Sequence, residues 1–297
     1  MQLSLFSISY AGLWGQQRLG LEEFIAKASE LGYSGVMFAG KRPHLSVLDW
    51  DDEAIPSLRA ALGEHAVACT AVAGYTDFSR PAAPEVPVLE MQIDYVGQLA
   101  RLARALGGSI VRVFTAYEAD GEDATASWRR VVTALREAAD RAAEYQIMLA
   151  VQNHHDVALH TDALLELVSD VDRPNCRLGF DAWSPALRGE DLPEAARKAA
   201  PYTVMTTNAD YVRLPRFRYR PEVVNYQPAE PPLVRAVPFG TGFIDFQAFF
   251  SALREGGFDG PAHYEMCSPL RGGGSLENLD HCARTYVQWM QEHGFAS

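Results

Sequence analysis

The chain has 297 residues, of which 48% are hydrophobic and 22% are charged. These proportions are usual for a globular domain and argue against a disordered or fibrous chain. The formal net charge of −12 would repel a phosphate backbone, so general nucleic-acid binding is not expected.

The cysteines and the apolar runs indicate a cytoplasmic protein. Four cysteines lie far apart and no CxxC pair occurs, which favours reduced thiols over a disulfide framework. They are Cys69, Cys176, Cys267 and Cys282. No run of about 18 apolar residues occurs, so no membrane-spanning segment is expected. The N-terminal MQLSLFSISYAG has no basic start, and its alternation favours a first strand over a signal peptide.

Short apolar runs alternate with longer amphipathic segments along the chain. The runs predict eight strands, near residues 3–9, 34–40, 65–75, 109–115, 147–153, 176–181, 202–208 and 261–267. Helical periodicity follows each strand, over residues 21–32, 51–63, 88–107, 124–145, 161–170, 192–200, 246–257 and 275–294. This alternation, without a change in composition, predicts an α/β fold: a single (β/α)8 TIM-barrel domain over residues 1–297.

Residues 211–242 interrupt this rhythm. The segment is rich in proline, carries five arginines and has no clean period, so it predicts a long irregular loop. Because it follows the seventh strand, it should lie on the catalytic face as a lid or a wall of the pocket. A contact between subunits is the alternative interpretation.

The carboxyl ends of barrel strands usually carry the catalytic groups. Here Gln152 ends the fifth strand, Asp181 the sixth, Thr207 and Asn208 the seventh, and Glu265 the eighth. A carboxylate after a buried strand is costly unless it is paired, hydrogen-bonded or bound to a metal. Asp181 and Glu265 are therefore the most informative residues. The alternative is that each is hydrogen-bonded to a neighbouring loop.

Other strand-end residues are candidates for contact with a substrate. His154 and His155 follow the fifth strand, and we expect one of them to face the pocket and the other a loop. The candidate substrate-binding residues are Trp14, Arg112, Trp183 and Arg271. The tryptophans suit sugar stacking or simple packing, and a buried Arg112 needs an anionic or hydroxyl-rich ligand or a carboxylate partner.

Two further features have ordinary structural interpretations that we favour. Arg271 precedes a glycine run that could hold an anion through backbone N–H groups, although a flexible turn is the simpler reading. His263 lies two residues before Glu265 and should face the barrel interior, where a neutral core histidine is expected.

The order of these motifs resembles the sugar phosphate isomerase/epimerase family, the xylose isomerase-like barrels. The resemblance rests on LAVQNHH, GFDAW, TTNAD, GTGFIDFQAFFSALREGGFDG and HYEMC, and it covers essentially the whole chain. It implies a divalent cation, Mn²⁺ or Mg²⁺, with Gln152, Asp181, Asn208 and Glu265 as the candidate ligands. It also implies proton transfer through an enediolate, with Glu265 or His154 as the catalytic group.

The sequence departs from the family pattern at three positions. Gln152 stands in place of a glutamate, Thr207 in place of a histidine, and Ala209 in place of a common lysine. The two remaining carboxylates give the ligand set a charge of about −2 instead of −3, so weaker metal binding is expected.

The resemblance implies an isomerase or epimerase of a small sugar or keto-sugar. The alternatives are a 3-keto-sugar lyase or deglycosidase with the same metal site, and a sugar-binding or partner subunit without turnover. A metal-dependent nuclease is disfavoured by the net charge and by the few histidines at strand ends. A small carbohydrate is the expected partner, with neither nucleic acid nor membrane, and a homo-oligomer is possible.

Overall fold

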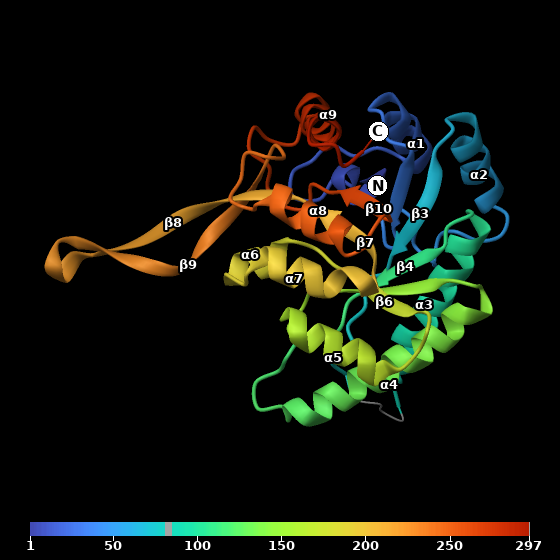
Figure 1. Ribbon diagram of the computed structural model, residues 1–297, viewed down its shortest axis with the longest axis horizontal. Coiled ribbons are helices and arrows are strands. Elements are labelled where there is room, and N and C mark those ends of the chain that lie inside the picture. Colours follow the sequence, from blue (N-terminus) through green and yellow to red (C-terminus); the bar gives the residue numbers. More distant parts are fainter. Residues whose placement is uncertain (81–84, 297) are drawn as a thin grey trace.

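A closed barrel of eight parallel strands forms the centre of the protein (Figure 1). The structure is a computed structural model that describes residues 1–80 and 85–296. Around the barrel the strand order is β1-β10-β7-β6-β5-β4-β3-β2. The bounds are β1 (Gln2–Phe6), β2 (Gly35–Ala39), β3 (Ala68–Ala73), β4 (Ile110–Val113), β5 (Met148–Gln152), β6 (Cys176–Gly179), β7 (Thr203–Asn208) and β10 (Pro261–Tyr264). The predicted single-domain TIM barrel is confirmed.

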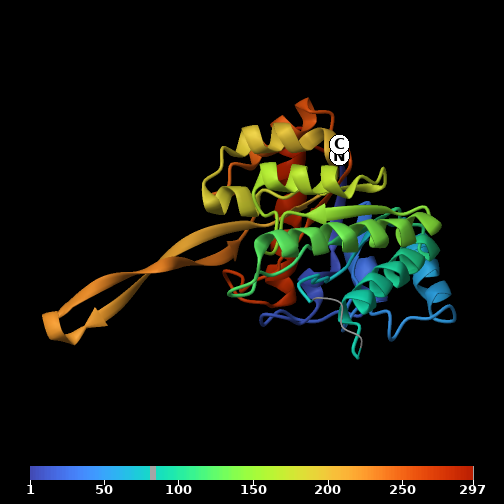
Figure 2. The ribbon, with the colours of Figure 1, turned by 90° about the horizontal axis from the view of Figure 1, so that it is seen from below.

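Helices cover the outside of the barrel (Figures 1 and 2). They are α1 (Leu21–Glu30), α2 (Ile55–Glu64), α3 (Val88–Ala105), α4 (Ala124–Glu144), α5 (Thr161–Val171), α6 (Trp183–Arg188), α7 (Leu192–Ala199), α8 (Phe246–Glu255) and α9 (Leu276–Glu292). Helices α4, α5, α7, α8 and α9 begin where a side chain accepts a backbone N–H group, as Asp123 does for α4 and Ser275 for α9. The short α6 and the 3₁₀ turn at Ser7–Tyr10 were not predicted.

The core has two layers because side chains alternate along each strand. One layer lies between strands and helices, as with Phe24 and Phe249, which are fully buried. A smaller cluster fills the barrel interior. Its buried members are Phe6, Ile8, Ala11, Met37, Ala39, Ala71, Ala73, Ile110, Ala150 and Met205. The barrel is therefore a packed core and not a pore.

The irregular loop expected over residues 211–242 is not found. Residues of β8 (Asp210–Arg220) and β9 (Asn225–Val237) pair as a long antiparallel hairpin that projects from the barrel (Figures 1 and 2). A register shift at Pro215 interrupts the ladder. Both strands of a two-stranded ribbon are edges, where proline is tolerated, so the proline-rich sequence does not exclude strands here. We call residues 211–237 the hairpin arm.

The base of the hairpin arm is fixed to the barrel by one carboxylate. Asp210 accepts hydrogen bonds from the backbone N–H groups of Tyr211, Gly240 and Gly242, at 2.9, 3.0 and 2.7 Å. A Cβ at Gly242 would lie 2.0 Å from Asp210 Oδ1, so only glycine allows this approach. The arm therefore leaves the end of β7 from a defined anchor.

Two expectations about the chain can be compared with the described residues. No helix among them combines the length and apolar character needed to cross a membrane. All four cysteines are free, and three of them are buried.

Candidate active site at the barrel mouth

A cavity of about 360 Å³ opens among the strand ends and the loops that follow them. Its lining includes residues from β1, β4 and β5 and from the segments after β2, β3 and β10. Of the residues predicted from the sequence, Trp14, Arg112, Gln152, His154, His155 and Glu265 line it. The closed barrel therefore brings strand-end residues that are far apart in the sequence into one cavity.

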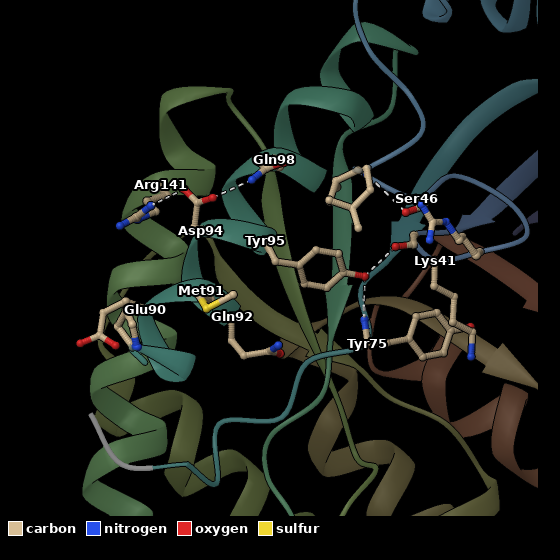
Figure 3. Close-up of a pocket in the computed structure, with 15 residues that line it drawn as sticks. Lys41, Ser46, Tyr75, Glu90, Met91, Gln92, Asp94, Tyr95, Gln98 and Arg141 are labelled. Atoms are coloured by element: carbon tan, nitrogen blue, oxygen red, sulfur yellow. Dashed lines mark hydrogen bonds and ion pairs between the residues drawn. The ribbon is translucent and has the colours of Figure 1, made fainter. Parts of the chain in front are cut away.

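A larger groove of about 780 Å³ lies next to this cavity, along α3 (Figure 3). It contains none of the predicted site residues, and it shares only Lys41 and Tyr75 with the barrel cavity. The Tyr95 hydroxyl donates to the Gly40 carbonyl at 2.7 Å and accepts the Tyr75 N–H at 3.3 Å. Tyr95 therefore fixes the wall between the two spaces, and the predicted site residues line the smaller one.

Asp181 is buried and held by groups from the ends of β5 and β6. Gln152 Nε2 donates to Asp181 Oδ2 at 2.6 Å, and the Ser184 N–H donates to Oδ1 at 3.3 Å. Asn153 clamps the backbone of Asp181, donating to its carbonyl and accepting its N–H. Burial raises the pKa of Asp181 to about 7, with a smaller contribution from Glu265, while the Gln152 hydrogen bond opposes the shift. Asp181 does not itself line the cavity, whereas Gln152, which is hydrogen-bonded to it, does.

Glu265 faces the cavity and is supported by the thiol two residues later. Cys267 Sγ donates to Glu265 Oε1 at 3.2 Å, and the Tyr211 hydroxyl lies 3.3 Å from the same sulfur. Burial raises the pKa of Glu265, although the Cys267 hydrogen bond and Arg112 oppose the shift. A carboxyl with a raised pKa at a cavity wall is suited to accept and return a proton.

Arg112 is a buried cation in the cavity wall. Its Nη1 donates to the Gly74 carbonyl at 3.0 Å, and its Cζ lies 4.0 Å from the centre of the Phe114 ring. Its Nε is buried without a hydrogen-bond partner among the described residues. No carboxylate in that part of the chain forms an ion pair with Arg112, so the carboxylate partner considered from the sequence is not found.

Both histidines of the tandem pair line the cavity, where we expected only one to do so. His155 has a φ of +69°, and this left-handed turn places its ring beside that of His154, with their Nδ1 atoms 2.9 Å apart. Burial, chiefly, lowers the pKa of each ring to about 4. Both rings are therefore neutral at pH 7, so either can accept a proton.

Asn208 is not brought to this group. Its side-chain N–H₂ donates to the His263 carbonyl at 3.1 Å and to the Tyr286 hydroxyl of α9 at 3.3 Å, on the helix side of β7. Strand alternation then turns Thr207 to the barrel side, where it pairs in register with His263. Thr207 Oγ1 is buried without a partner among the described residues.

The other predicted residues take different places. Trp14 is at the rim of the cavity and 46% exposed. Trp183 begins α6 and packs on Tyr211, with ring centres 4.1 Å apart, outside the cavity lining.

Arg271 is exposed and also lies outside that lining. The turn after it is held by Asn278, which donates to the carbonyls of Arg271 and Gly273. His263 is buried and hydrogen-bonded, with a pKa lowered to about 3 by burial, as a neutral core histidine should be.

The residues around Glu265 can be tested for their fit to a divalent cation. Among the described residues, no three or more His, Cys, Asp or Glu side chains are grouped as a metal site. A cation here would need the neutral oxygens of Gln152 and Thr207 beside the carboxylates of Asp181 and Glu265. Such an all-oxygen set suits Mg²⁺ or Mn²⁺, and the unpartnered Thr207 Oγ1 has a free lone pair. The donor types suit such a cation, but Gln152 would have to turn its oxygen toward it, and Asp181 and Thr207 lie outside the cavity lining.

Several residues that line the cavity or support its lining were not found from the sequence. The rings of Tyr75 and Phe114 make cation–π contacts with the Arg112 guanidinium. Cys267 donates to Glu265 and is itself in contact with the Tyr211 hydroxyl. The period-two spacing of Arg112 and Phe114, and of Glu265 and Cys267, was an available signal. Tyr211 could not be found in this way, because the hairpin arm was predicted as a loop.

Comparisons with known proteins agree with this architecture. A family model described as xylose isomerase-like TIM barrel matches residues 25–292. A ketose 3-epimerase of Arthrobacter globiformis is 23% identical over 256 residues, which cover 84% of this chain and 78% of that protein.

Two solved structures are similar in fold. D-psicose 3-epimerase of Clostridium cellulolyticum H10, solved with D-tagatose, has a TM-score of 0.76 at 16% identity, over 98% of this chain and 99% of that one. The probable 3-DHS dehydratase AsbF of Bacillus anthracis has a TM-score of 0.73 at 17% identity, over 97% and 99%. The matched span, the closed barrel and the strand-end cavity lead to one conclusion: the chain belongs to the xylose isomerase-like TIM barrel family.

Proposed function

We propose that this chain is a sugar isomerase or epimerase that moves a proton on the carbon next to the carbonyl of a ketose or keto-sugar. The observation that carries the proposal is the Glu265 carboxyl, which faces a cavity of about 360 Å³ at the barrel mouth and has a raised pKa. The names of the relatives, a ketose 3-epimerase and a D-psicose 3-epimerase, support a ketose as substrate.

In this proposal Glu265 takes the proton and an enediolate forms on the substrate. The Cys267 thiol fixes one carboxyl oxygen, which leaves the other free to face the substrate carbon. His154 is the second candidate for taking this proton, because its neutral ring lines the same cavity and can accept a proton. Phe6, Ile8 and Phe114 provide an apolar wall that limits water around the reacting carbon.

A divalent cation, Mn²⁺ or Mg²⁺, belongs to the same proposal. Asp181 and Glu265 would hold it through carboxylates, and Gln152 and Thr207 through neutral oxygens, with Thr207 in place of Asn208. Bound there, the cation would supply positive charge beside the oxygen that becomes negative during proton transfer. Asn153 would keep Asp181 in place through its two backbone hydrogen bonds.

Proton exchange with solvent tests the reaction. The purified protein is incubated in deuterated water with D-fructose, D-tagatose, D-psicose or L-ribulose, with and without added Mn²⁺. Deuterium at the carbon next to the carbonyl, together with formation of the epimer or isomer, is the expected result. Exchange should disappear in Glu265→Gln and persist in Glu255→Gln, an exposed position on α8.

Two outcomes would reject the proposal. Expulsion of a group from the neighbouring carbon of a 3-keto-glycoside, without epimer formation, would point to a lyase. Saturable sugar binding with no exchange under any metal condition would point to a binding subunit.

A further inference from the structure

Two cations line the barrel cavity without a carboxylate partner. The Arg112 side chain is 2% exposed, and its Nε has no hydrogen-bond partner among the described residues. Lys41 lies in the segment after β2 and lines the same cavity. Neither cation forms an ion pair within that part of the chain.

The Tyr75 ring makes cation–π contacts with both Lys41 and Arg112. Lys41 Nζ lies 3.6 Å from the centre of the Tyr75 ring, and Arg112 Cζ lies 5.1 Å from it. Figure 3 shows the Lys41 chain running beside that ring. Burial, and secondarily Arg112, lowers the pKa of Lys41. Cation–π contacts offset only part of the desolvation of two neighbouring positive charges.

We propose that Arg112 and Lys41 form a subsite for an anionic group, a phosphate or a carboxylate, on the substrate. An anion would satisfy the free Arg112 Nε–H or the remaining guanidinium N–H groups and would neutralise the repulsion between the two cations. This inference rests on the proposed function and narrows its substrate class to sugar phosphates or sugar acids. The hydroxyl oxygens of a neutral sugar could accept hydrogen bonds from the two cations, but only an anion would also offset their charge.

Calorimetric binding measurements on the full chain test the subsite without requiring turnover. The probes are D-fructose, D-fructose 6-phosphate and D-gluconate. The two anionic probes distinguish a site for phosphate from a site for carboxylate. We expect one anionic probe to bind at least about tenfold more tightly than D-fructose. Arg112→Met and Lys41→Met should each reduce that preference about tenfold or more.

The matched control is Arg213→Met. Arg213 also stacks on an aromatic ring, with Cζ 4.3 Å from the centre of Phe243, but it lies outside the cavity. This variant should bind all three probes as the wild type does. Lys41 is in a loop, so its variant stays informative even if Arg112→Met fails to fold.

The subsite is rejected if no anionic probe binds more tightly than D-fructose, or if the Lys41 variant keeps the preference. Anion binding without proton exchange would leave the subsite in place and reject the proposed function. Proton exchange on neutral ketoses, with no tighter binding of an anionic probe, would support the proposed function and reject the subsite.

The hairpin arm supports a second, independent inference. Its apolar side chains include Phe217, Tyr219, Val223, Val224, Tyr226 and Leu233, and all of them are more than half exposed. A two-stranded ribbon on its own is marginally stable in water, because neither face is covered. An exposed apolar surface of this kind marks a site of protein association.

Charge indicates what covers the arm. Residues 211–237 contain five arginines and two glutamates, for a formal charge of +3. The whole chain carries −12, so the remainder carries −15. We infer that the arm docks on the acidic body of a second copy of this chain, and that exchange of two arms forms a symmetric dimer.

Light scattering coupled to size exclusion tests this dimer on the full chain. The wild type should have twice the mass of one chain, and the triple variant Phe217→Ser, Tyr219→Ser, Tyr226→Ser should be monomeric. The control replaces Leu48, Val86 and Met91 with serine; these residues are equally exposed but lie on the barrel. That control should remain dimeric.

A second variant tests the contribution of charge to the dimer. The triple variant Arg216→Glu, Arg218→Glu, Arg220→Glu reverses the charge of the arm and should also be monomeric. A monomeric wild type, even one that binds a different protein, overturns the inference. A dimer that survives both arm variants overturns it as well.

Discussion

Strand β7 and the hairpin arm follow each other in the chain, yet their surroundings are opposite. Five of the six residues of β7 are buried, between β6 and β10. In β8, every residue from Arg216 onward is at least partly exposed, and the strand pairs with β9 alone. The contrast teaches that neighbours on all sides fix β7, whereas the arm depends on its own ladder and on whatever covers it. Proton chemistry needs the fixed region, and association can use the exposed one.

The largest effect should come from Glu265→Gln, because the proposed chemistry depends on this one carboxyl of the fixed region. Loss of a general base lowers the rate about 10² to 10⁴-fold. The readout is kcat/KM for proton exchange, with circular dichroism to verify the fold. A variant that retains more than a tenth of the wild-type rate would move the chemistry elsewhere, with His154→Gln as the next variant to measure.

Removing one ring from each region measures the contrast directly. Phe249→Ala, in the layer between barrel and helices, should lower the free energy of unfolding by about 3–5 kcal/mol, because it empties a fully buried site. Phe217→Ala, where the ring is 61% exposed, should change that of the isolated monomer by no more than about 0.5 kcal/mol. Denaturant titration of both variants in the monomeric charge-reversed background gives the two values. Equal losses would contradict the comparison.

A buried histidine gives the fixed region a pH dependence. His44 Nε2 lies 3.2 Å from the Leu19 carbonyl, and Nδ1 lies 2.9 Å from Ser7 Oγ. Burial, chiefly, lowers its pKa from 6.5 to about 4, so the unfolded chain takes up a proton first as the pH falls. Stability present above pH 6.5 should decline toward pH 4 by about 3 kcal/mol.

Denaturant titration between pH 7 and pH 4 checks this contribution. His44→Gln should reduce the decline by about the 3 kcal/mol assigned to His44, because His154, His155 and His263 keep their own lowered pKa values. His281→Gln, at an exposed position on α9, should leave the decline unchanged. An unchanged slope in His44→Gln would mean that folding does not lower the pKa of His44.

The smallest effect concerns the cation. Gln152→Glu adds a third carboxylate, at the end of β5, as in the family pattern. The charge of the proposed ligand set then becomes more negative, from −2 to −3. Affinity for Mn²⁺ should increase about tenfold, measured by calorimetry at pH 7. The control is Gln98→Glu on α3, outside the barrel cavity. Unchanged affinity in Gln152→Glu would place any metal elsewhere.

Local periodicity was sufficient for most of the barrel and for part of the site. Each strand–helix pair has its own apolar spacing, so the eight barrel strands could be predicted without long-range information. Placing Gln152 and Glu265 at strand ends followed from the same periodicity. Asn208 was predicted as a metal ligand, but its side chain bonds to Tyr286, while its neighbour Thr207 faces the barrel side; a one-residue change of register exchanges the two faces of a strand.

The sequence alone determined the closed barrel and the position of its acidic residues at the carboxyl ends, because both follow from patterns only a few residues long. Only the tertiary structure decided that residues 211–237 form an arm, that Arg112 has no carboxylate partner, and that Asn208 bonds to α9. These features depend on contacts between residues far apart in the chain, and no local pattern of hydrophobicity or charge encodes such contacts.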